Sequence, residues 1–243
     1  MSFYNTLALH YSNIFPLSEN HLSLFDSVIN KESKKGIDIG CATGILTNAL
    51  QQFIPNMIGI DLSEVMIDVA KEFYNENIEF KVMDMTSIAS EFKPEAFDII
   101  TCLGNTLVHV NHEHVKKLFN DIHVCLTQDG QFIVQIVNYD LILKEKRTSL
   151  PSIINENIEF HRDYVYPHDD STIVFNAKLV DLKTGESFND KTVLYPLTHL
   201  QISEWLEETG FKITLEFGAW NMSPYDSNSS PSLIIVAKKK VTE

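Results

Sequence analysis

The sequence is poor in basic residues, and it lacks any long apolar run. Its 243 residues carry 19 lysines and arginines against 33 aspartates and glutamates, which gives a formal net charge of −14. This charge repels the phosphates of nucleic acids and anionic membrane surfaces. No run reaches the roughly 18 apolar residues that a membrane-spanning helix needs. We therefore expect no nucleic acid and no membrane among the partners.

Cysteine and arginine are both rare. The three cysteines, Cys41, Cys102 and Cys125, lie apart in apolar surroundings, without the paired spacing of a disulfide framework. Together with a start that lacks a signal-peptide pattern, they favour a cytoplasmic protein. Arginine occurs only as Arg147 and Arg162. An anionic ligand therefore has few side chains that can bind it through two parallel hydrogen bonds.

Short β-favouring runs alternate with helical patterns between residues 36 and 138. This alternation predicts successive βαβ units and a mostly parallel sheet in an α/β fold. The expected strands are Gly36–Gly40, Met57–Asp61, Ile78–Met83, Phe97–Leu103 and Gly130–Val137.

Several residues have the chemistry of helix ends. Ser63 and Asn111 are predicted N-caps, and Asp129-Gly130 is predicted to stop the helix after Asn111 and to start the next strand. Thr198 and Gln201 fit a capping box for a helix near the C-terminus that ends at Gly210.

Residues 141–198 break the alternation. Their pattern predicts an antiparallel insertion of three strands, with turns near residues 167–170 and 183–186. Such an insertion is suited to cover an active site as a lid. The main domain would then consist of residues 1–140 and 199–243.

Three glycines at four-residue spacing stand in "GIDIGCATGILT", residues 36–47. This spacing also occurs in close helix contacts, but "IDI" favours a strand and the helical period starts only after Gly44. The stretch therefore predicts a strand-to-helix turn whose backbone N–H groups face a ligand, with glycine allowing close approach. The loop is one residue shorter than the dinucleotide fingerprint, which disfavours an NAD-dependent oxidoreductase.

Acidic residues stand at or near the ends of three predicted strands. Asp38 lies two residues before Gly40, where a carboxylate repels a diphosphate but suits an ammonium group. Asp61 ends the second strand and is placed to accept both hydroxyls of a ribose. Asp84 follows the third strand and is a candidate partner for an adenine amino group. Met66, one turn into the next helix, offers a thioether to the adenine face.

These segments together resemble the class I S-adenosylmethionine-dependent methyltransferases. The resemblance rests on "DIGCATG", "GIDLSEVMIDVAK", "VMDM" and "FDIITCLGNTLVHV". It implies a doubly wound, Rossmann-like, seven-stranded and mostly parallel sheet whose last-inserted strand is antiparallel, with S-adenosyl-L-methionine across the strand ends. The implied cofactor-binding residues are Asp38, Gly40, Cys41, Ala42, Thr43, Gly44, Asp61, Leu62, Met66, Asp84, Met85, Cys102, Leu103 and Gly104.

A narrower resemblance involves "TCLGNTLVHV" and "IVNYDLIL", which are similar to segments of glycine N-methyltransferase-like enzymes. It implies that Asn105 and His109 approach the cofactor and the acceptor. Those enzymes have an arginine before "NYD" that binds the substrate carboxylate, whereas this chain has Val137. An apolar side chain cannot pair with a carboxylate, so we do not expect glycine itself as the acceptor.

Further candidates lie outside these segments. Tyr11 is predicted to fold over the cofactor with its N-terminal segment, although packing against the sheet explains it equally well. Arg162 and Tyr164, in the insertion, are candidate substrate contacts. The cluster of His109, His112 and His114 lacks the further ligands of a metal site, so no metal is expected.

The sequence thus predicts a methyltransferase for a small soluble acceptor, most simply an amine nitrogen. His109, Asn105 and Tyr11 are its candidate catalytic residues. An O-methyltransferase and a non-catalytic cofactor-binding module remain open alternatives. The expected oligomeric state is a monomer or a homodimer.

Overall fold

The computed structural model describes residues 3–74, 78–167 and 171–240. Its centre is a seven-stranded sheet in the order β10-β11-β5-β4-β1-β2-β3. The strands are β1 (Lys35–Ile39), β2 (Asn56–Asp61), β3 (Ile78–Val82), β4 (Phe97–Cys102), β5 (Leu126–Val137), β10 (Phe211–Phe217) and β11 (Ser232–Lys239). β11 runs antiparallel to both of its neighbours, and β1 to β5 pair in parallel. The predicted doubly wound sheet with one antiparallel strand is confirmed.

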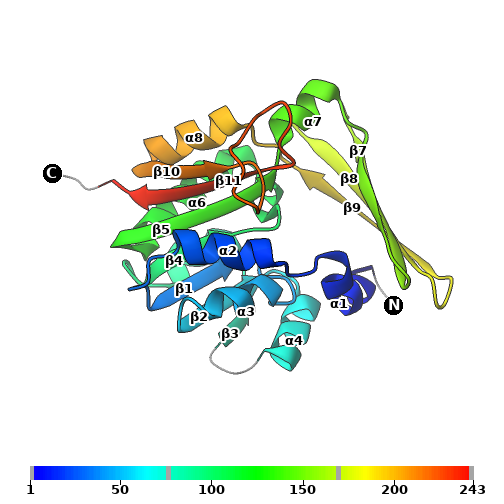
Figure 1. Cartoon of the computed structure of the whole chain (residues 1–243), viewed down its shortest axis with the longest axis horizontal. Coiled ribbons are helices and arrows are strands. Elements are labelled where there is room, and N and C mark those ends of the chain that lie inside the picture. Colours follow the sequence, from blue (N-terminus) through cyan, green and yellow to red (C-terminus); the bar gives the residue numbers. More distant parts are fainter. Residues whose placement is uncertain (1–2, 75–77, 168–170, 241–243) are drawn as a thin grey trace.

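Helices cover both faces of this sheet (Figure 1). One apolar cluster joins a face of the sheet to α2 (Glu19–Val28), α3 (Ile45–Gln51) and α4 (Glu64–Phe73). A second joins the other face to α5 (Ile88–Glu91), α6 (His112–Cys125) and α8 (His199–Glu208). Short 3₁₀ turns, η1 (Met85–Ser87) and η2 (Thr106–His109), follow β3 and β4.

The predicted helix ends are largely confirmed. Ser63 accepts a hydrogen bond from the Met66 N–H, and Asn111 accepts one from the Glu113 N–H. Thr198 and Gln201 form the capping box that opens α8, and Gly210 follows its end with a φ of 89°. The prediction for Asp129-Gly130 is wrong. β5 already begins at Leu126, and this pair lies within the strand, where its register with β4 shifts.

The insertion forms a separate antiparallel sheet, which we call the lid. It follows α7 (Tyr139–Glu145) and contains four strands, β6 (Ser149–Ile154), β7 (Ile158–Val165), β8 (Ile173–Asp181) and β9 (Ser187–Leu194). The predicted count of three strands is wrong, because β6 adds a fourth. This strand contains Pro151 and lies at an edge of the lid, where proline is tolerated. Of the two predicted turns, the first includes residues 168–170, which lie outside the described residues.

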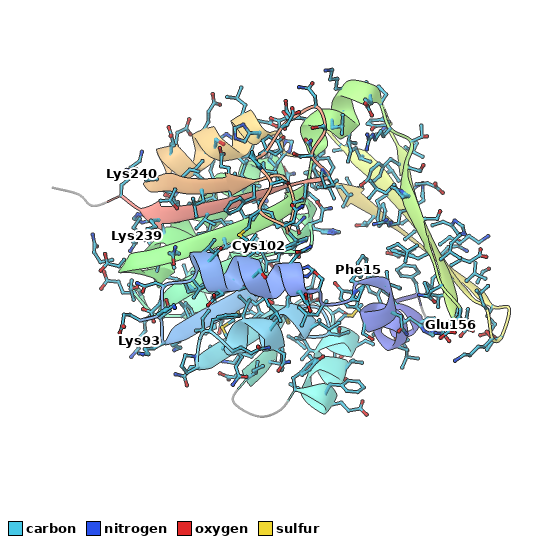
Figure 2. The ribbon with its side chains drawn as sticks, in the orientation of Figure 1. Phe15, Lys93, Cys102, Glu156, Lys239 and Lys240 are labelled. Carbon is cyan, nitrogen blue, oxygen red and sulfur yellow. The ribbon has the colours of Figure 1, made fainter. Side chains whose placement is uncertain are left out.

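The lid stands beside the main sheet, with α7 at one end of the gap and α1 (Phe3–Ile14) near the other (Figure 1). A third apolar cluster joins α1 to α4 and to the inner strands of the lid. Side chains from both sheets extend into the space between them (Figure 2). No helix in the described part of the chain is long and apolar enough to cross a membrane.

Candidate active site between the strand ends and the lid

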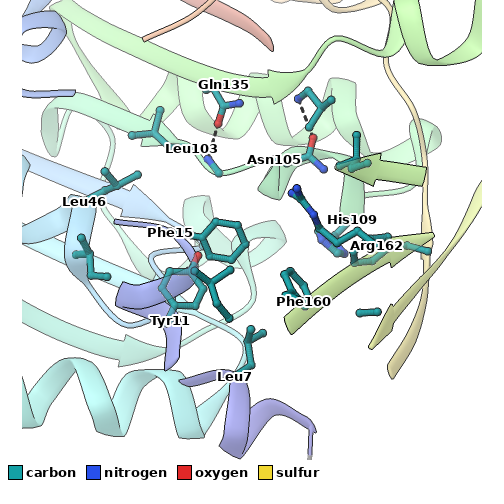
Figure 3. Close-up of a pocket in the computed structure, with 18 of the residues that line it drawn as sticks. Leu7, Tyr11, Phe15, Leu46, Leu103, Asn105, His109, Gln135, Phe160 and Arg162 are labelled. Carbon is teal, nitrogen blue, oxygen red and sulfur yellow. Dashed lines mark hydrogen bonds between the residues drawn. The ribbon is translucent and has the colours of Figure 1, made fainter. Parts of the chain in front are cut away.

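A cavity of about 530 Å³ lies between the main sheet and the lid. Its walls come from α1, from the loops after β1 and β4, from the end of β5 and from the inner face of the lid. Figure 3 shows residues of this lining. Ten of the residues predicted from sequence line the cavity: Tyr11, Asp38, Gly40, Cys41, Leu103, Gly104, Asn105, His109, Arg162 and Tyr164.

The loop after β1 is tied to the end of β2. The N–H groups of Gly40 and Cys41 donate to the Ile60 carbonyl at 2.7 and 2.9 Å. The Ala42 N–H donates to Asp61 Oδ2 at 2.9 Å, and the Ser63 N–H donates to Oδ1 at 2.9 Å. The loop and the Asp61 carboxylate therefore form one rigid unit, and each oxygen of Asp61 keeps a further lone pair for a ligand.

Two glycines of this loop adopt a backbone conformation that contacts within the protein require. Gly40 and Gly44 both have positive φ, 72° and 81°. A Cβ on Gly40 would lie 2.2 Å from Thr106 Cγ2, and one on Gly44 would lie 2.7 Å from Phe80 Cζ. Close packing against Thr106 and Phe80 thus explains these two glycines without any ligand.

Asp38 is a buried carboxylate at the floor of the cavity. Its side chain accepts hydrogen bonds from the hydroxyls of Thr47, at 2.6 Å, and Thr101, at 2.7 Å. Burial raises the pKa of Asp38 to about 6, although the two threonine hydrogen bonds act in the opposite direction. The site therefore holds a carboxylate that a nearby cation would stabilise.

His109 and Tyr11 face the cavity with opposite acid-base properties. Desolvation lowers the pKa of His109, and the negative charge of Asp61 opposes this shift. Burial raises the pKa of Tyr11 above its ordinary value, with further contributions from Asp61 and Asp38. At neutral pH the imidazole is thus a neutral base, whereas the phenol stays protonated and can only donate or accept a hydrogen bond.

Asn105 holds the cavity wall together. It has a φ of 69°, its Oδ1 accepts from the Val137 N–H at 3.0 Å, and its Nδ2 donates to the Tyr139 hydroxyl at 3.0 Å. Tyr139 is fully buried and forms a further hydrogen bond with Tyr164 of the lid. The amide of Asn105 is therefore mainly a link between β5, α7 and the lid.

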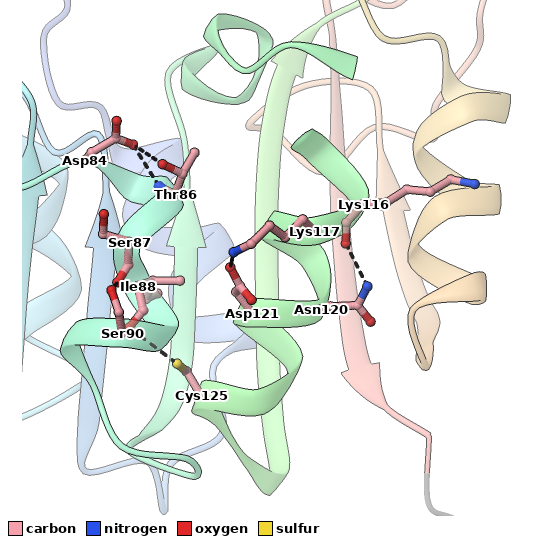
Figure 4. A network of polar contacts seen from close by, with 10 residues as sticks. All are labelled: Asp84, Thr86, Ser87, Ile88, Ser90, Lys116, Lys117, Asn120, Asp121 and Cys125. Carbon is pink, nitrogen blue, oxygen red and sulfur yellow. Dashed lines mark hydrogen bonds and ion pairs between the residues drawn. The ribbon is translucent and has the colours of Figure 1, made fainter. Parts of the chain in front are cut away.

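The predicted contacts to adenosine lie outside the lining of this cavity. Leu62 is 72% exposed and accessible, whereas Met66 is buried beneath α1. Asp84 is exposed and caps η1 by accepting hydrogen bonds from the N–H and the hydroxyl of Thr86, both at 2.8 Å (Figure 4). The others outside the lining are Ala42, Thr43, Gly44, Asp61, Met85 and Cys102. Contact between an adenine and Met66 would require α1 to move.

Several residues of the cavity had no signal in the sequence. Gln135 on β5 accepts a hydrogen bond from the Gly104 N–H at 2.8 Å. Asp190 on β9 accepts a hydrogen bond from the Tyr4 hydroxyl. His21 and Trp220 pack with ring centroids 4.3 Å apart. All of these residues come from segments far apart in the chain, so only the fold brings them together.

The donor set fits S-adenosylmethionine at its methionine end. Asp38 offers negative charge beside the loop of Gly40, and Gly104 has no atom within 4 Å of where its Cβ would stand. The sheet order, the antiparallel β11, and the loop and carboxylate at the ends of β1 and β2 define the class I S-adenosylmethionine-dependent methyltransferase fold.

Comparisons with known proteins support this class. Residues 37–130 match the family described as a methyltransferase domain. A solved S-adenosylmethionine-dependent methyltransferase from Clostridium acetobutylicum superposes with a TM-score of 0.80 at 17% identity, over 98% of this chain and 99% of that one. Residues 37–130 are therefore similar to a methyltransferase domain, the solved structure shares the fold, and the wider resemblance is confirmed.

The curated relatives differ in the atom that they methylate. Ubiquinone biosynthesis O-methyltransferase of Pseudomonas fluorescens is 37% identical over 132 residues, which are 52% of this chain and 53% of the relative. Glycine/sarcosine N-methyltransferase of Aphanothece halophytica is 26% identical over 220 residues, 85% of this chain and 77% of the relative. The chain spans about half the length of several of the relatives it matches.

Proposed function

We propose that the protein uses S-adenosylmethionine to methylate a nitrogen of a small soluble amine. The observation that carries this proposal is that Asp38, Gly40 and the inner face of the lid all line one cavity. A donor held at the strand ends and an acceptor held under the lid would share this space. A nucleic acid or a membrane is not proposed as a partner, because the chain is strongly acidic.

Methyl transfer from a sulfonium requires little of the protein beyond the correct positioning of the donor and the acceptor. The bound cofactor supplies an electrophilic methyl group on a sulfonium. The walls hold the acceptor in line, at about 3 to 3.5 Å, and exclude water. His109 takes the proton that the acceptor loses, because its lowered pKa leaves the imidazole neutral at pH 7. Tyr11 stays protonated and orients groups by hydrogen bonding.

The first test is a radiolabelled methyl-transfer screen over amines, amino acids, amino sugars and phenols, with cofactor binding followed by calorimetry. We expect label on amines and a measurable binding heat. Tight cofactor binding without label on any acceptor would instead favour a non-catalytic binding module. Absence of binding heat would contradict the proposal altogether.

Replacing His109 with glutamine distinguishes an amine from a hydroxyl acceptor. An amine becomes nucleophilic once the pH exceeds its own pKa, so H109Q should lose less than about tenfold in turnover at high pH. A hydroxyl needs the base at any pH below its own pKa, about 10 for a phenol, so the loss over that range would be about 10²- to 10⁴-fold. The pH dependence of turnover in both proteins is the measurement. For the wild type we expect turnover to rise with pH through the lowered pKa of His109, because only the neutral imidazole accepts a proton.

The O-methyltransferase remains the second candidate. It is favoured by the higher identity to the ubiquinone biosynthesis enzyme, although that match covers only about half of either chain. The match to the N-methyltransferase covers more of the chain, including the lid, at lower identity. Label on phenols alone, with a large H109Q effect at every pH below about 10, would favour the O-methyltransferase.

A further inference from the structure

Among the described lid residues that line the cavity, Arg162 is the one cation, and most of its neighbours there are apolar. Phe160, Arg162 and Tyr164 alternate along β7 and all line the cavity. Arg162 stands opposite Ala177 on β8, and Ala177 stands opposite Asp190 on β9. The three residues therefore form a row across the lid.

Arg162 lacks an acidic partner among the described residues. Its Nη2 donates to the Pro151 carbonyl at 2.6 Å, and the guanidinium lies 5.8 Å from the centre of the Phe160 ring. Its Nε is buried without a hydrogen-bond partner. Asp190 lies in the same row, but the backbones of Arg162 and Asp190 are two strand spacings apart, which is about 10 Å. Tyr4 already donates a hydrogen bond to Asp190.

The other arginine of the chain has a different environment. Arg147 follows α7 outside the cavity lining, and its Nε donates to Glu145 at 2.7 Å. Arg162 is half-buried, and desolvation lowers its pKa. A partly desolvated guanidinium with an unused donor is costly unless a ligand completes its hydrogen bonds. The natural complement is a planar carboxylate or a phosphate.

We propose that the methyl acceptor carries an anionic group, a carboxylate or a phosphate, and that Arg162 binds this group from the lid. This proposal rests on the methyltransferase function proposed above and names its substrate class. Figure 3 shows Arg162 among the residues that line the cavity. The guanidinium then fixes which end of the acceptor faces the lid, so the nucleophile points toward the strand ends.

The test uses paired amines that differ only in the anion. Suitable pairs are β-alanine with its amide, 4-aminobenzoate with 4-aminobenzamide, and phosphoethanolamine with ethanolamine. Methyl transfer is measured for the wild type and for Arg162→Met, Arg162→Lys and the matched control Arg147→Met. Cofactor affinity of each protein is measured separately by calorimetry, and folding is checked by thermal melting.

We expect the wild type to prefer the anionic member of at least one pair. Arg162→Met should raise KM for that member by about 10- to 100-fold, with little change for the neutral member. Arg162→Lys should show a smaller increase in KM, because the ammonium group keeps the positive charge but lacks the two parallel N–H donors of a guanidinium. Arg147→Met should behave as the wild type. The pair that responds distinguishes a carboxylate from a phosphate.

Other outcomes overturn the proposal in distinguishable ways. Equal loss for both members of a pair, or label only on neutral amines or on none of the anionic probes, would remove Arg162 from acceptor recognition. Weaker cofactor binding by Arg162→Met would assign the guanidinium to the cofactor. Absence of cofactor binding by the wild type would instead contradict the methyltransferase function itself.

Discussion

Replacing Asp61 with alanine should weaken S-adenosylmethionine binding by about 10²- to 10⁴-fold. Two ribose hydroxyls that donate to a carboxylate contribute about 1.5 to 3 kcal/mol each, and about 1.4 kcal/mol corresponds to tenfold in affinity. The substitution also frees the Ala42 and Ser63 N–H groups that now donate to Asp61. Loss of these bonds loosens the loop after β1. Titration calorimetry with the cofactor measures the effect directly.

A control must distinguish the loss of the Asp61 carboxylate from a disturbance of the adjacent helix α4. Ser63→Ala removes the cap of α4, since Ser63 Oγ accepts the Met66 N–H at 3.4 Å. This variant should lose about 1 kcal/mol of stability and bind the cofactor as the wild type does. If Asp61→Ala also binds normally, the carboxylate does not hold a ribose and the assignment of the cofactor end is wrong.

Much of the fold was predictable because its signals are local. Each N-cap at Ser63, Asn111 and Thr198 depends on a side chain and an N–H two or three residues further on. The strand β6 was missed because Pro151 normally argues against a strand, and only its place at the edge of the lid makes it acceptable. That place depends on pairing with β7 and has no local signal.

The candidate site likewise contains residues that the sequence could place and residues that only the fold brings into position. Asp38 and Asp61 could be placed together because parallel strands end at one edge of the sheet. Thr101, which donates to Asp38, could not, because its position depends on the pairing of Asp38 with Thr101 between β1 and β4. The burial of Met66 beneath α1 likewise results from packing between distant segments. Register and packing are non-local and are absent from any short sequence pattern.

Replacing Asp38 with asparagine should stabilise the fold above about pH 6. The pKa of Asp38 rises from 3.8 to about 6 in the folded protein. The folded state therefore binds more protons than the unfolded state between these values, and stability falls as pH rises through this window. At 1.36 kcal/mol per pKa unit, the ionised carboxylate costs about 3 kcal/mol at neutral pH. Denaturant unfolding at several pH values should show a gain of about 1 to 3 kcal/mol for Asp38→Asn.

The gain should shrink as the pH falls and vanish below about pH 4, where Asp38 is protonated in both states. Asp98→Asn, on β4, is a suitable control. The Asp98 carboxylate accepts the N–H groups of Lys34 and Lys35 at 2.8 and 3.0 Å, so this variant should lose stability. A pH-independent effect of Asp38→Asn would show that burial does not penalise the charge.

The same variant should bind S-adenosylmethionine more weakly. In the proposed binding mode the ammonium group of the ligand lies next to Asp38, so binding offsets the free-energy cost of burying the ionised carboxylate. Near pH 6, cofactor binding by the wild type should release a proton from Asp38, since a neighbouring cation favours the ionised form. Calorimetry in two buffers of different ionisation enthalpy measures this release. Asp38→Asn should lack it, and equal proton release by the two proteins would show that Asp38 does not contact the cationic part of the cofactor.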